Sequence, residues 1–164
     1  MSKNPTKIIG EPGKQELFVF REFDAPRELV FKAFTDPKIL IQWLGPKNLT
    51  MKIEKYDVKN GGSWRYVYAD SDGNQFGFHG VFHDITEPER AIQTFEFEFN
   101  PVKGRPSLDS ATFETLPGNR TRLTIQSVYF SVMDRDGMLQ NMEKGVTEGY
   151  ERLDELLAKD NALT

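Results

Sequence analysis

The chain contains two regions with different spacings of apolar residues. From Leu49 to Tyr129, apolar side chains recur at every second position, whereas in the last thirty residues they recur in steps of three and four. A period of two is typical of strands with one buried face, and a period near 3.6 is typical of an amphipathic helix. The pattern therefore predicts a sheet with one apolar face and a C-terminal helix that covers it.

The C-terminal stripe predicts one long helix of roughly 35 to 40 Å, at 1.5 Å per residue. The stripe consists of Leu139, Met142, Val146, Tyr150, Leu153 and Leu157. Gly145 and Gly149 lie beside it, and each costs about 1 kcal/mol relative to Ala in a helix interior. They permit either the close approach of another element or a hollow for a guest molecule.

The first half of the chain predicts a strand followed by two short helices. Residues 15–23 form the strand, and Asp24-Ala25-Pro26 opens the first helix because proline suits a first turn. Thr35-Asp36-Pro37 ends that helix, and the second extends to Gly45-Pro46 with Trp43 as an anchor. We expect residues 1–14 to be a flexible tail, residues 15–160 a single domain, and residues 161–164 a C-terminal tail.

About six antiparallel strands are predicted between the helices. The alternation of Met51 and Ile53 changes phase before Tyr56, as a β-bulge would cause. In the clearest alternation, Phe95, Phe97 and Phe99 face the core, while Glu96 and Glu98 face water. A later hairpin is predicted from residues 111–116 and 121–129, after a loop that contains Pro101, Gly104 and Pro106.

Composition excludes several classes of protein. The net charge of −4 and the absence of clustered Lys and Arg argue against a nucleic-acid partner. Cysteine is absent, which removes thiolate nucleophiles and disulfides and fits the reducing cytoplasm. No stretch reaches the ~20 apolar residues of a membrane span. We therefore expect a cytoplasmic protein, monomeric or homodimeric, with no membrane span.

Candidate metal and catalytic motifs are weak. His79 and His83 lie four residues apart on a predicted strand, about 13 Å from each other, which is too far to bind one ion. The acidic run from Asp70 to Asn74 lacks the EF-hand spacing and is read as a hairpin turn. Because nucleophile and dinucleotide motifs are absent too, no catalytic residue, metal or cofactor is predicted.

Several spaced motifs are similar to those of one known family. These are residues 23–31, Thr35-Asp36-Pro37, residues 43–46, residues 61–65, residues 80–82 with 87–90, and Gly149-Tyr150 with Leu153 and Leu157. Together they resemble the homologues of the activator of heat-shock-protein-90 ATPase, over about residues 15 to 159. That family belongs to the START-like, birch-pollen-allergen-like helix-grip (SRPBCC) superfamily.

The resemblance implies an α+β helix-grip fold. A curved antiparallel sheet of six to seven strands would hold the C-terminal helix over its concave face, with a cavity between them. Relatives of this fold bind lipids, hormones or polyketides. The chain departs from the family at Tyr150, where Trp is common, and at Gln93, where an apolar residue is usual. We also expect it to lack the separate N-terminal domain of chaperone activators.

The favoured function is the binding of a small hydrophobic or amphipathic ligand in that cavity. The candidate ligand-binding residues are Trp64, Tyr66, Phe78, Phe82, Gln93, Phe95, Phe97, Tyr129, Met142, Val146, Gly149 and Tyr150. The same aromatic set is also consistent with an ordinary packed core. Two further functions stay open: a co-chaperone-like module that stimulates a chaperone ATPase, and a cyclase-like or hydrolase-like enzyme that uses the cavity.

Overall fold

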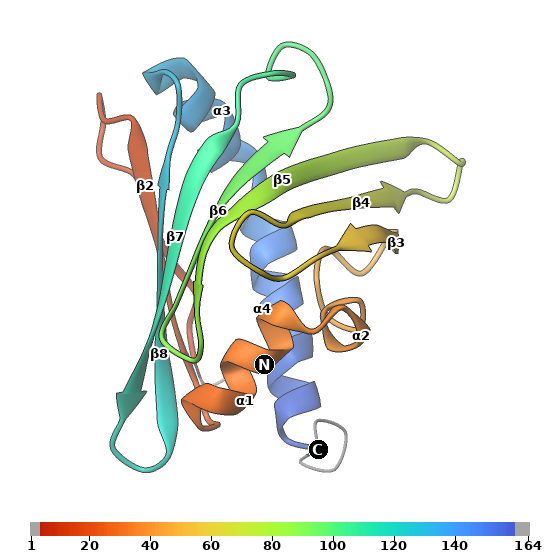
Figure 1. The fold of residues 1–164 in the computed structure, drawn as a ribbon. Helices are drawn as coiled ribbons and strands as arrows, with labels where there is room; N and C mark the ends of the chain where they lie inside the picture. Colours follow the sequence, from red (N-terminus) through yellow and green to blue (C-terminus); the bar gives the residue numbers. More distant parts are fainter. Residues whose placement is uncertain (1–3, 160–164) are drawn as a thin grey trace.

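The computed structural model describes residues 4–159, which form one antiparallel sheet of eight strands and four helices (Figure 1). The strand order in the sheet is β1-β2-β8-β7-β6-β5-β4-β3. The strands are β1 (Lys7–Ile9), β2 (Glu16–Phe23), β3 (Thr50–Tyr56), β4 (Ser63–Ala69), β5 (Gln75–Thr86), β6 (Arg90–Phe97), β7 (Ser107–Leu116) and β8 (Arg120–Val128). The helices are α1 (Arg27–Thr35), α2 (Pro37–Leu40), α3 (Val132–Asn141) and α4 (Glu143–Leu157).

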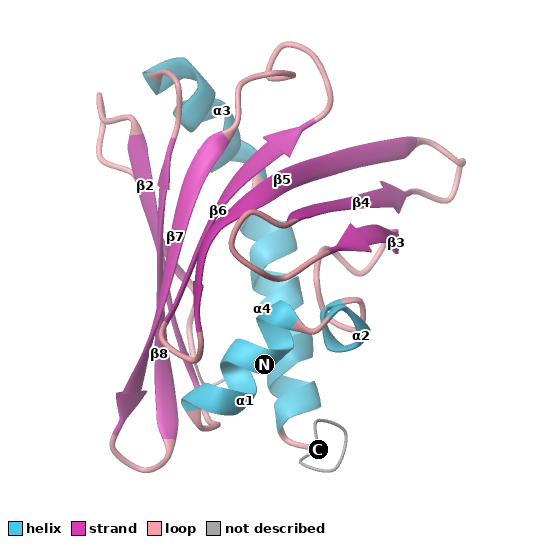
Figure 2. Ribbon diagram, in the orientation of Figure 1, coloured by secondary structure: helices cyan, strands magenta, loops and turns pink. Residues whose placement is uncertain are grey.

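The sheet curves around the last helix, which is the predicted helix-grip arrangement. In Figure 2, α4 runs along the concave side of the sheet, and α1 and α2 lie beside its C-terminal half. The predicted bulge is confirmed, because the register between β3 and β4 shifts between Ile53 and Lys55. No helix among residues 4–159 combines the length and the apolar character that a membrane crossing requires.

One strand was not predicted. Residues 7–9, expected within a flexible tail, form β1 and pair with β2, so Ile8 lies opposite Val19. Ile8 also packs against the hydrophobic core, and this contact explains why a mostly polar segment is ordered. The predicted C-terminal tail, residues 161–164, lies outside the described residues.

The predicted single C-terminal helix is wrong in one respect, because it is interrupted at Met142. The Asn141 side chain donates a hydrogen bond to the Gly137 carbonyl at 2.7 Å, which competes with the backbone hydrogen bonds of the helix. Ser131 caps the start of α3, since its hydroxyl accepts from the Asp134 amide. The apolar stripe nevertheless continues across the break, and its last three members are buried.

A buried ion pair fastens α4 to the sheet. Arg21 on β2 donates from Nη1 to Asp154 Oδ1 at 3.0 Å, and its guanidinium carbon lies 4.8 Å from the centre of the Phe23 ring. Trp43 holds α2 against α1, because its indole N–H donates to the Ala33 carbonyl at 3.0 Å. These contacts hold α4 against the sheet and α2 against α1.

Candidate functional site

The inner face of the sheet can be followed from one strand to the next by register. Phe82 pairs with Gln93, Gln93 with Asp109, Asp109 with Ser127, and Ser127 with Leu17. Paired residues of antiparallel strands point to the same face. Since Phe82 and Leu17 at the two ends of this row are both buried, the polar side chains between them also face the interior.

Aromatic rings cover the part of the inner face that is formed by β4, β5 and β6. The rings of Trp64 and Tyr66 lie 5.0 Å apart, Trp64 and Phe95 5.7 Å apart, and Phe78 and Phe97 4.9 Å apart, all between centroids. The predicted residues Trp64, Tyr66, Phe78, Phe95 and Phe97 thus form a continuous group, called here the aromatic wall. Phe82 adjoins Tyr56 instead, with ring centroids 5.4 Å apart.

Asp109 is the interior carboxyl group. The Ser107 hydroxyl donates to its Oδ1 at 2.9 Å. Burial raises the pKa of Asp109 to about 6, although the hydroxyls of Ser107 and Ser127 act in the opposite direction. Among residues 4–159, no basic side chain forms an ion pair with it.

The charge of Asp109 affects the pKa values of three tyrosines. Burial raises the pKa of Tyr66, Tyr129 and Tyr150 above the usual value of 10, and the Asp109 charge raises each further. They come from β4, from the residue after β8, and from α4 respectively. Tyr129 shares the Ser107 and Ser127 hydroxyls with Asp109, whereas Tyr66 and Tyr150 interact with it through its charge alone.

Several inner-face side chains are only half-buried, although α4 lies over them. These are Phe78, Gln93, Phe95, Phe97, Asp109 and Tyr129; Met142, directly before α4, and Val146 on α4 are half-buried as well. By contrast, Trp64, Tyr66, Phe82 and Tyr150 are buried. Two surface hollows lie elsewhere, one lined by β3, β4 and Gln75 and the other by polar residues between Gln140 and Glu148. The predicted ligand-binding residues line neither of these two hollows.

Gly149 does not face open space, which corrects its interpretation as part of a hollow. A Cβ atom at this position would lie 3.2 Å from the Trp43 carbonyl oxygen and 3.4 Å from the Gly45 nitrogen. Gly145 likewise faces Pro46, at 3.4 Å. The helix glycines therefore permit α4 to approach the segment after α2, which is the other interpretation considered from the sequence.

Tyr150 belongs to the packed core more than to the half-buried region. Its ring meets the Phe23 ring edge-on, with centroids 5.5 Å apart, and lies 6.1 Å from the Trp43 ring. Edge-on contacts of this kind stabilise aromatic cores. Only its hydroxyl, through its coupling to Asp109, connects this residue to the candidate site.

Sequence reasoning missed Asp109 because it began the strand at Ala111. The observed strand β7 begins four residues earlier, at Ser107, so Asp109 is a strand residue and not a loop residue. Phe113 is buried on the inner face, and positions two and four residues before it on one strand share that face. Counting back from Phe113 was the signal that could have found the carboxyl group.

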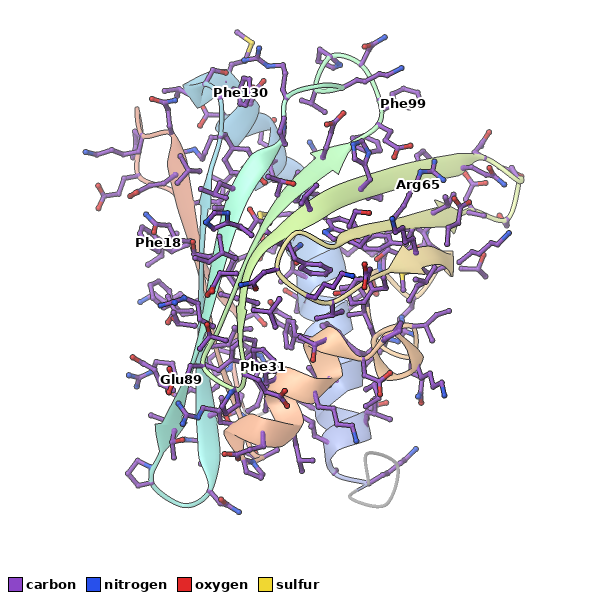
Figure 3. The ribbon with its side chains drawn as sticks, viewed as in Figure 1. Phe18, Phe31, Arg65, Glu89, Phe99 and Phe130 are labelled. Atoms are coloured by element: carbon purple, nitrogen blue, oxygen red, sulfur yellow. The ribbon has the colours of Figure 1, made fainter. Side chains whose placement is uncertain are left out.

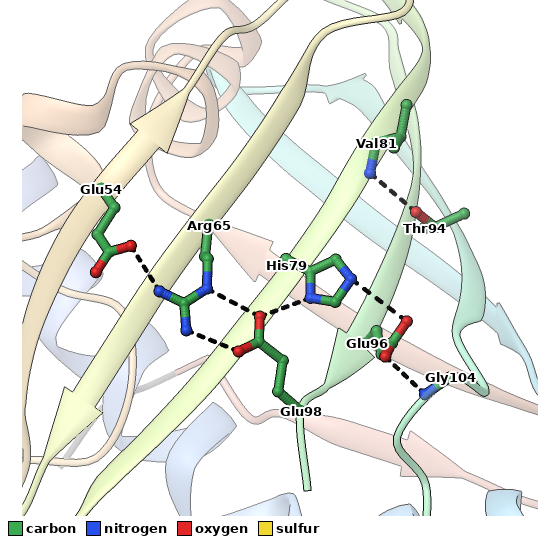
Figure 4. A network of polar contacts seen from close by, with 8 residues as sticks. All are labelled: Glu54, Arg65, His79, Val81, Thr94, Glu96, Glu98 and Gly104. Carbon is green, nitrogen blue, oxygen red and sulfur yellow. Dashed lines mark hydrogen bonds and ion pairs between the residues drawn. The ribbon is translucent and has the colours of Figure 1, made fainter.

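The outer face carries a separate network of charges, shown in Figure 4. Glu98 accepts from Arg65 at 2.7 Å and 3.0 Å, and its Oε2 lies 2.6 Å from His79 Nδ1. Arg65 also donates to Glu54, and His79 Nε2 lies 3.4 Å from Glu96. Glu96 and Glu98 do point outward, but the expectation of freely solvated charges is corrected, because both are paired. His83 is exposed.

The acidic segment after β4 is a turn. Asp70 Oδ1 accepts from the backbone amides of Asp72 and Asn74, at 3.0 Å and 2.9 Å, and these bonds close the hairpin. In the described part of the chain, no group of three or more His, Cys, Asp or Glu side chains is placed to hold a metal ion.

Large apolar side chains are exposed at the end of the molecule where α3 lies. Phe99, which was predicted to continue the inner face, lies beyond the end of β6 and is 56% exposed. Phe130 is 57% exposed, and Figure 3 shows both residues at the same end of the molecule. Arg105 connects the two segments, because it donates to Asp134 on α3 at 2.7 Å and lies over the Phe130 ring.

Comparison with known proteins agrees with this geometry. A sequence model of the family described as Activator of Hsp90 ATPase homolog 1-like protein matches residues 24–158. The chain belongs to this family. No curated protein matches the chain.

Solved structures with the same fold come from several bacteria. A protein from Arthrobacter aurescens is 25% identical, with a TM-score of 0.82 over 93% of this chain and 91% of that one. A protein from Mycobacterium smegmatis is 23% identical, with a TM-score of 0.82 over 93% and 97%. An AHSA1 protein from Silicibacter pomeroyi is 24% identical, with a TM-score of 0.73 over 88% and 99%. At these identities, the likeness to the last two concerns the fold.

Proposed function

We propose that this AHSA1-like protein binds a small hydrophobic or amphipathic ligand between the sheet and α4. The observation that carries the proposal is the partial exposure of side chains between the sheet and the helix, namely Phe78, Gln93, Phe95, Phe97 and Tyr129 from the sheet, and Met142 and Val146 from the start of the helix. Solid packing would bury such side chains almost completely. Ligand sites are typically apolar and carry a few convergent polar groups, as this face does.

In this proposal the two parts of the inner face have different roles. The aromatic wall removes the apolar body of the ligand from water, at about 25 cal/mol per Å² of apolar surface buried. The polar row, with Gln93 next to Asp109 in register, orients the polar end of the ligand. Tyr66 and Tyr129, from opposite parts of the sheet, contribute hydroxyl groups on one side of that row.

A neutral fluorescent probe tests the proposal. N-phenyl-1-naphthylamine carries no charge at neutral pH, and its emission rises when it leaves water. We expect saturable binding to the wild-type protein, and Val146→Phe, which adds bulk on the sheet-facing side of α4, should weaken binding by about tenfold or more. Thr147→Phe, on the adjacent helix position, is the matched control and should leave the affinity unchanged.

Thermal unfolding of both variants establishes that the helix remains folded. Equal affinities of the Val146→Phe and Thr147→Phe proteins would place the probe elsewhere and overturn the proposal. The absence of saturable binding to the wild-type protein would overturn it as well.

A co-chaperone-like activity is the second candidate, and membership of the family favours it. The test is the ATPase rate of the Hsp90-class chaperone from the same host, measured with increasing amounts of this protein. Stimulation that saturates supports the activity, and an unchanged rate at saturating protein excludes it. Met133→Asp changes a surface residue that is 82% exposed, so the same assay with this variant tests whether the exposed apolar surface takes part in the activity.

A further inference from the structure

We infer that the ligand of the interior site carries a basic amine, and that Asp109 binds it as an ammonium group beside the aromatic wall. The inference rests on the proposed function, because it specifies the class of ligand for the same site. It is drawn from three features of the interior: the acceptor capacity of the Asp109 carboxylate, the engagement of the buried arginines, and the aromatic faces around them.

The carboxylate has acceptor capacity that the protein does not use. An ionised carboxylate offers about four lone-pair sites. The Ser107 hydroxyl donates to Oδ1 at 2.9 Å, and Ser127, which pairs with Asp109 in register, supplies a second hydroxyl. Both donors are neutral, so the negative charge of Asp109 has no balancing charge from a described residue.

The two arginines that are buried among residues 4–159 are already engaged. Arg21 donates to both carboxylate oxygens of Asp154 and to the Glu22 carbonyl. Arg135, which is buried, donates to the Glu16 carbonyl and to Asp136. A positive charge for Asp109 must therefore come from outside the protein.

The surroundings of Asp109 suit a cation that is attached to an apolar body. Faces of Trp, Tyr and Phe rings attract an ammonium group when it lies within about 6 Å of the ring centre. Phe95 of the aromatic wall pairs with Ser107, which lies two residues before Asp109 on the same face of β7, so the carboxyl group and the wall are neighbours. The N–H groups of a ligand ammonium would replace the water that the Asp109 carboxylate loses on burial, whereas the Asp109 charge would repel a ligand carboxylate.

Three related probes test this inference by calorimetry. They are 1-naphthylmethylamine, which is cationic near neutral pH, 1-naphthylmethanol, which is neutral, and 1-naphthoic acid, which is anionic. All three present the same ring system to the aromatic wall. At pH 7.5 the wild-type protein should bind the amine about tenfold or more tightly than the alcohol, and bind the acid most weakly.

Asp109→Asn separates charge from shape, because the amide has nearly the same size. In this variant the amine and the alcohol should bind within about twofold of each other, while the affinity for the alcohol stays near that of the wild type. Glu114→Gln is the matched control, since it removes a carboxylate from an exposed position on the same strand. It should keep the full preference for the amine.

The preference should also depend on pH. The titratable groups that face Asp109 are Tyr66, Tyr129 and Tyr150, whose raised pKa values keep them neutral between pH 5 and 8. Arg21 lies over the Tyr150 ring and is ion-paired with Asp154. Asp109 is therefore the group that changes. Because its pKa is about 6, lowering the pH from 7.5 to 5.0 should weaken amine binding by about tenfold and leave alcohol binding unchanged.

The outcomes distinguish the two proposals. If the alcohol binds but the amine binds no more tightly, or if Asp109→Asn keeps the preference, the amine inference is wrong while the ligand-binding function stands. If none of the three probes binds the wild-type protein, both are overturned.

Discussion

Two carboxylates on opposite faces of the sheet differ in every respect that affects their charge. Glu98, directly after β6, lies between Arg65 and His79 on the outer face, and its pKa is lowered to about 2, chiefly by the hydrogen bonds from Arg65. Asp109 on β7 faces inward, and burial raises its pKa to about 6. The inner group has only hydroxyl partners, whereas the outer group is paired with the guanidinium of Arg65.

The comparison indicates that Glu98 has a structural role and that Asp109 is a candidate functional residue. A carboxylate that holds its charge through arginine and histidine partners contributes to the fold and has little reason to bind anything else. A buried carboxylate without a cation costs stability, and such costs are typical of binding and catalytic sites. This contrast is the reason for assigning ligand recognition to the inner face.

Removing the inner charge should give the largest change in stability. Between pH 4 and 6 the folded protein binds a proton at Asp109 that the unfolded chain releases, so stability falls as the pH rises through this range. Asp109→Asn removes that loss and should raise the free energy of unfolding by about 2 to 3 kcal/mol at pH 8. At pH 4, close to the unfolded pKa, the gain should fall to about 0.5 kcal/mol, and denaturant unfolding at both pH values measures it.

A decrease in stability at pH 8 would contradict this expectation. It would mean that the ionised carboxylate is held by interactions stronger than the two serine hydroxyls. The Glu114→Gln control should change the free energy of unfolding by less than about 0.5 kcal/mol at either pH.

Removing the outer charge should act in the opposite direction and more weakly. Glu98 has a lowered pKa, so its contribution is present above its unfolded value near 4.5 and is lost as the pH falls toward 2. Its side chain is 21% exposed and Arg65 is 38% exposed, so solvent screening reduces the effect. Glu98→Gln should lower the free energy of unfolding by about 1 kcal/mol at pH 7.

If Glu98→Gln stabilised the protein at pH 7, the proposed difference between a stabilising Glu98 and a destabilising Asp109 would be wrong. The same variant should leave the amine preference of the interior site unchanged, because Glu98 points away from it.

The smallest expected effects concern the two glycines of α4. Gly145→Ala should stabilise the protein by about 0.5 to 1 kcal/mol, since alanine favours the helix and its Cβ meets Pro46 at an ordinary 3.4 Å. Gly149→Ala should be neutral or destabilising by about 1 kcal/mol, because its Cβ meets rigid backbone at 3.2 Å. Thermal unfolding of the pair measures the difference.

If both alanine variants stabilised the protein equally, α4 would have room on the side of Gly45. That result would restore the interpretation of Gly149 as part of a hollow and would extend the candidate site toward the segment after α2.

Predictions from sequence succeeded where the signal was local. The alternation of Trp64, Tyr66 and Phe78 identified neighbouring inner-face aromatics, and the phase change before Tyr56 identified the bulge. Both follow from the period of two along single strands. The break at Met142 was missed, because it accompanies a side-chain hydrogen bond from Asn141 that leaves no trace in the apolar period.

The amino-acid sequence by itself determined that this protein has an aromatic sheet face and an apolar helix stripe to cover it, since both patterns repeat over a few adjacent residues. Only the tertiary structure decided which polar groups share the interior. Gln93, Asp109 and Ser127 come from three strands and meet through cross-strand register. Register depends on where each strand begins and how the sheet bends, and no short stretch of sequence contains that information.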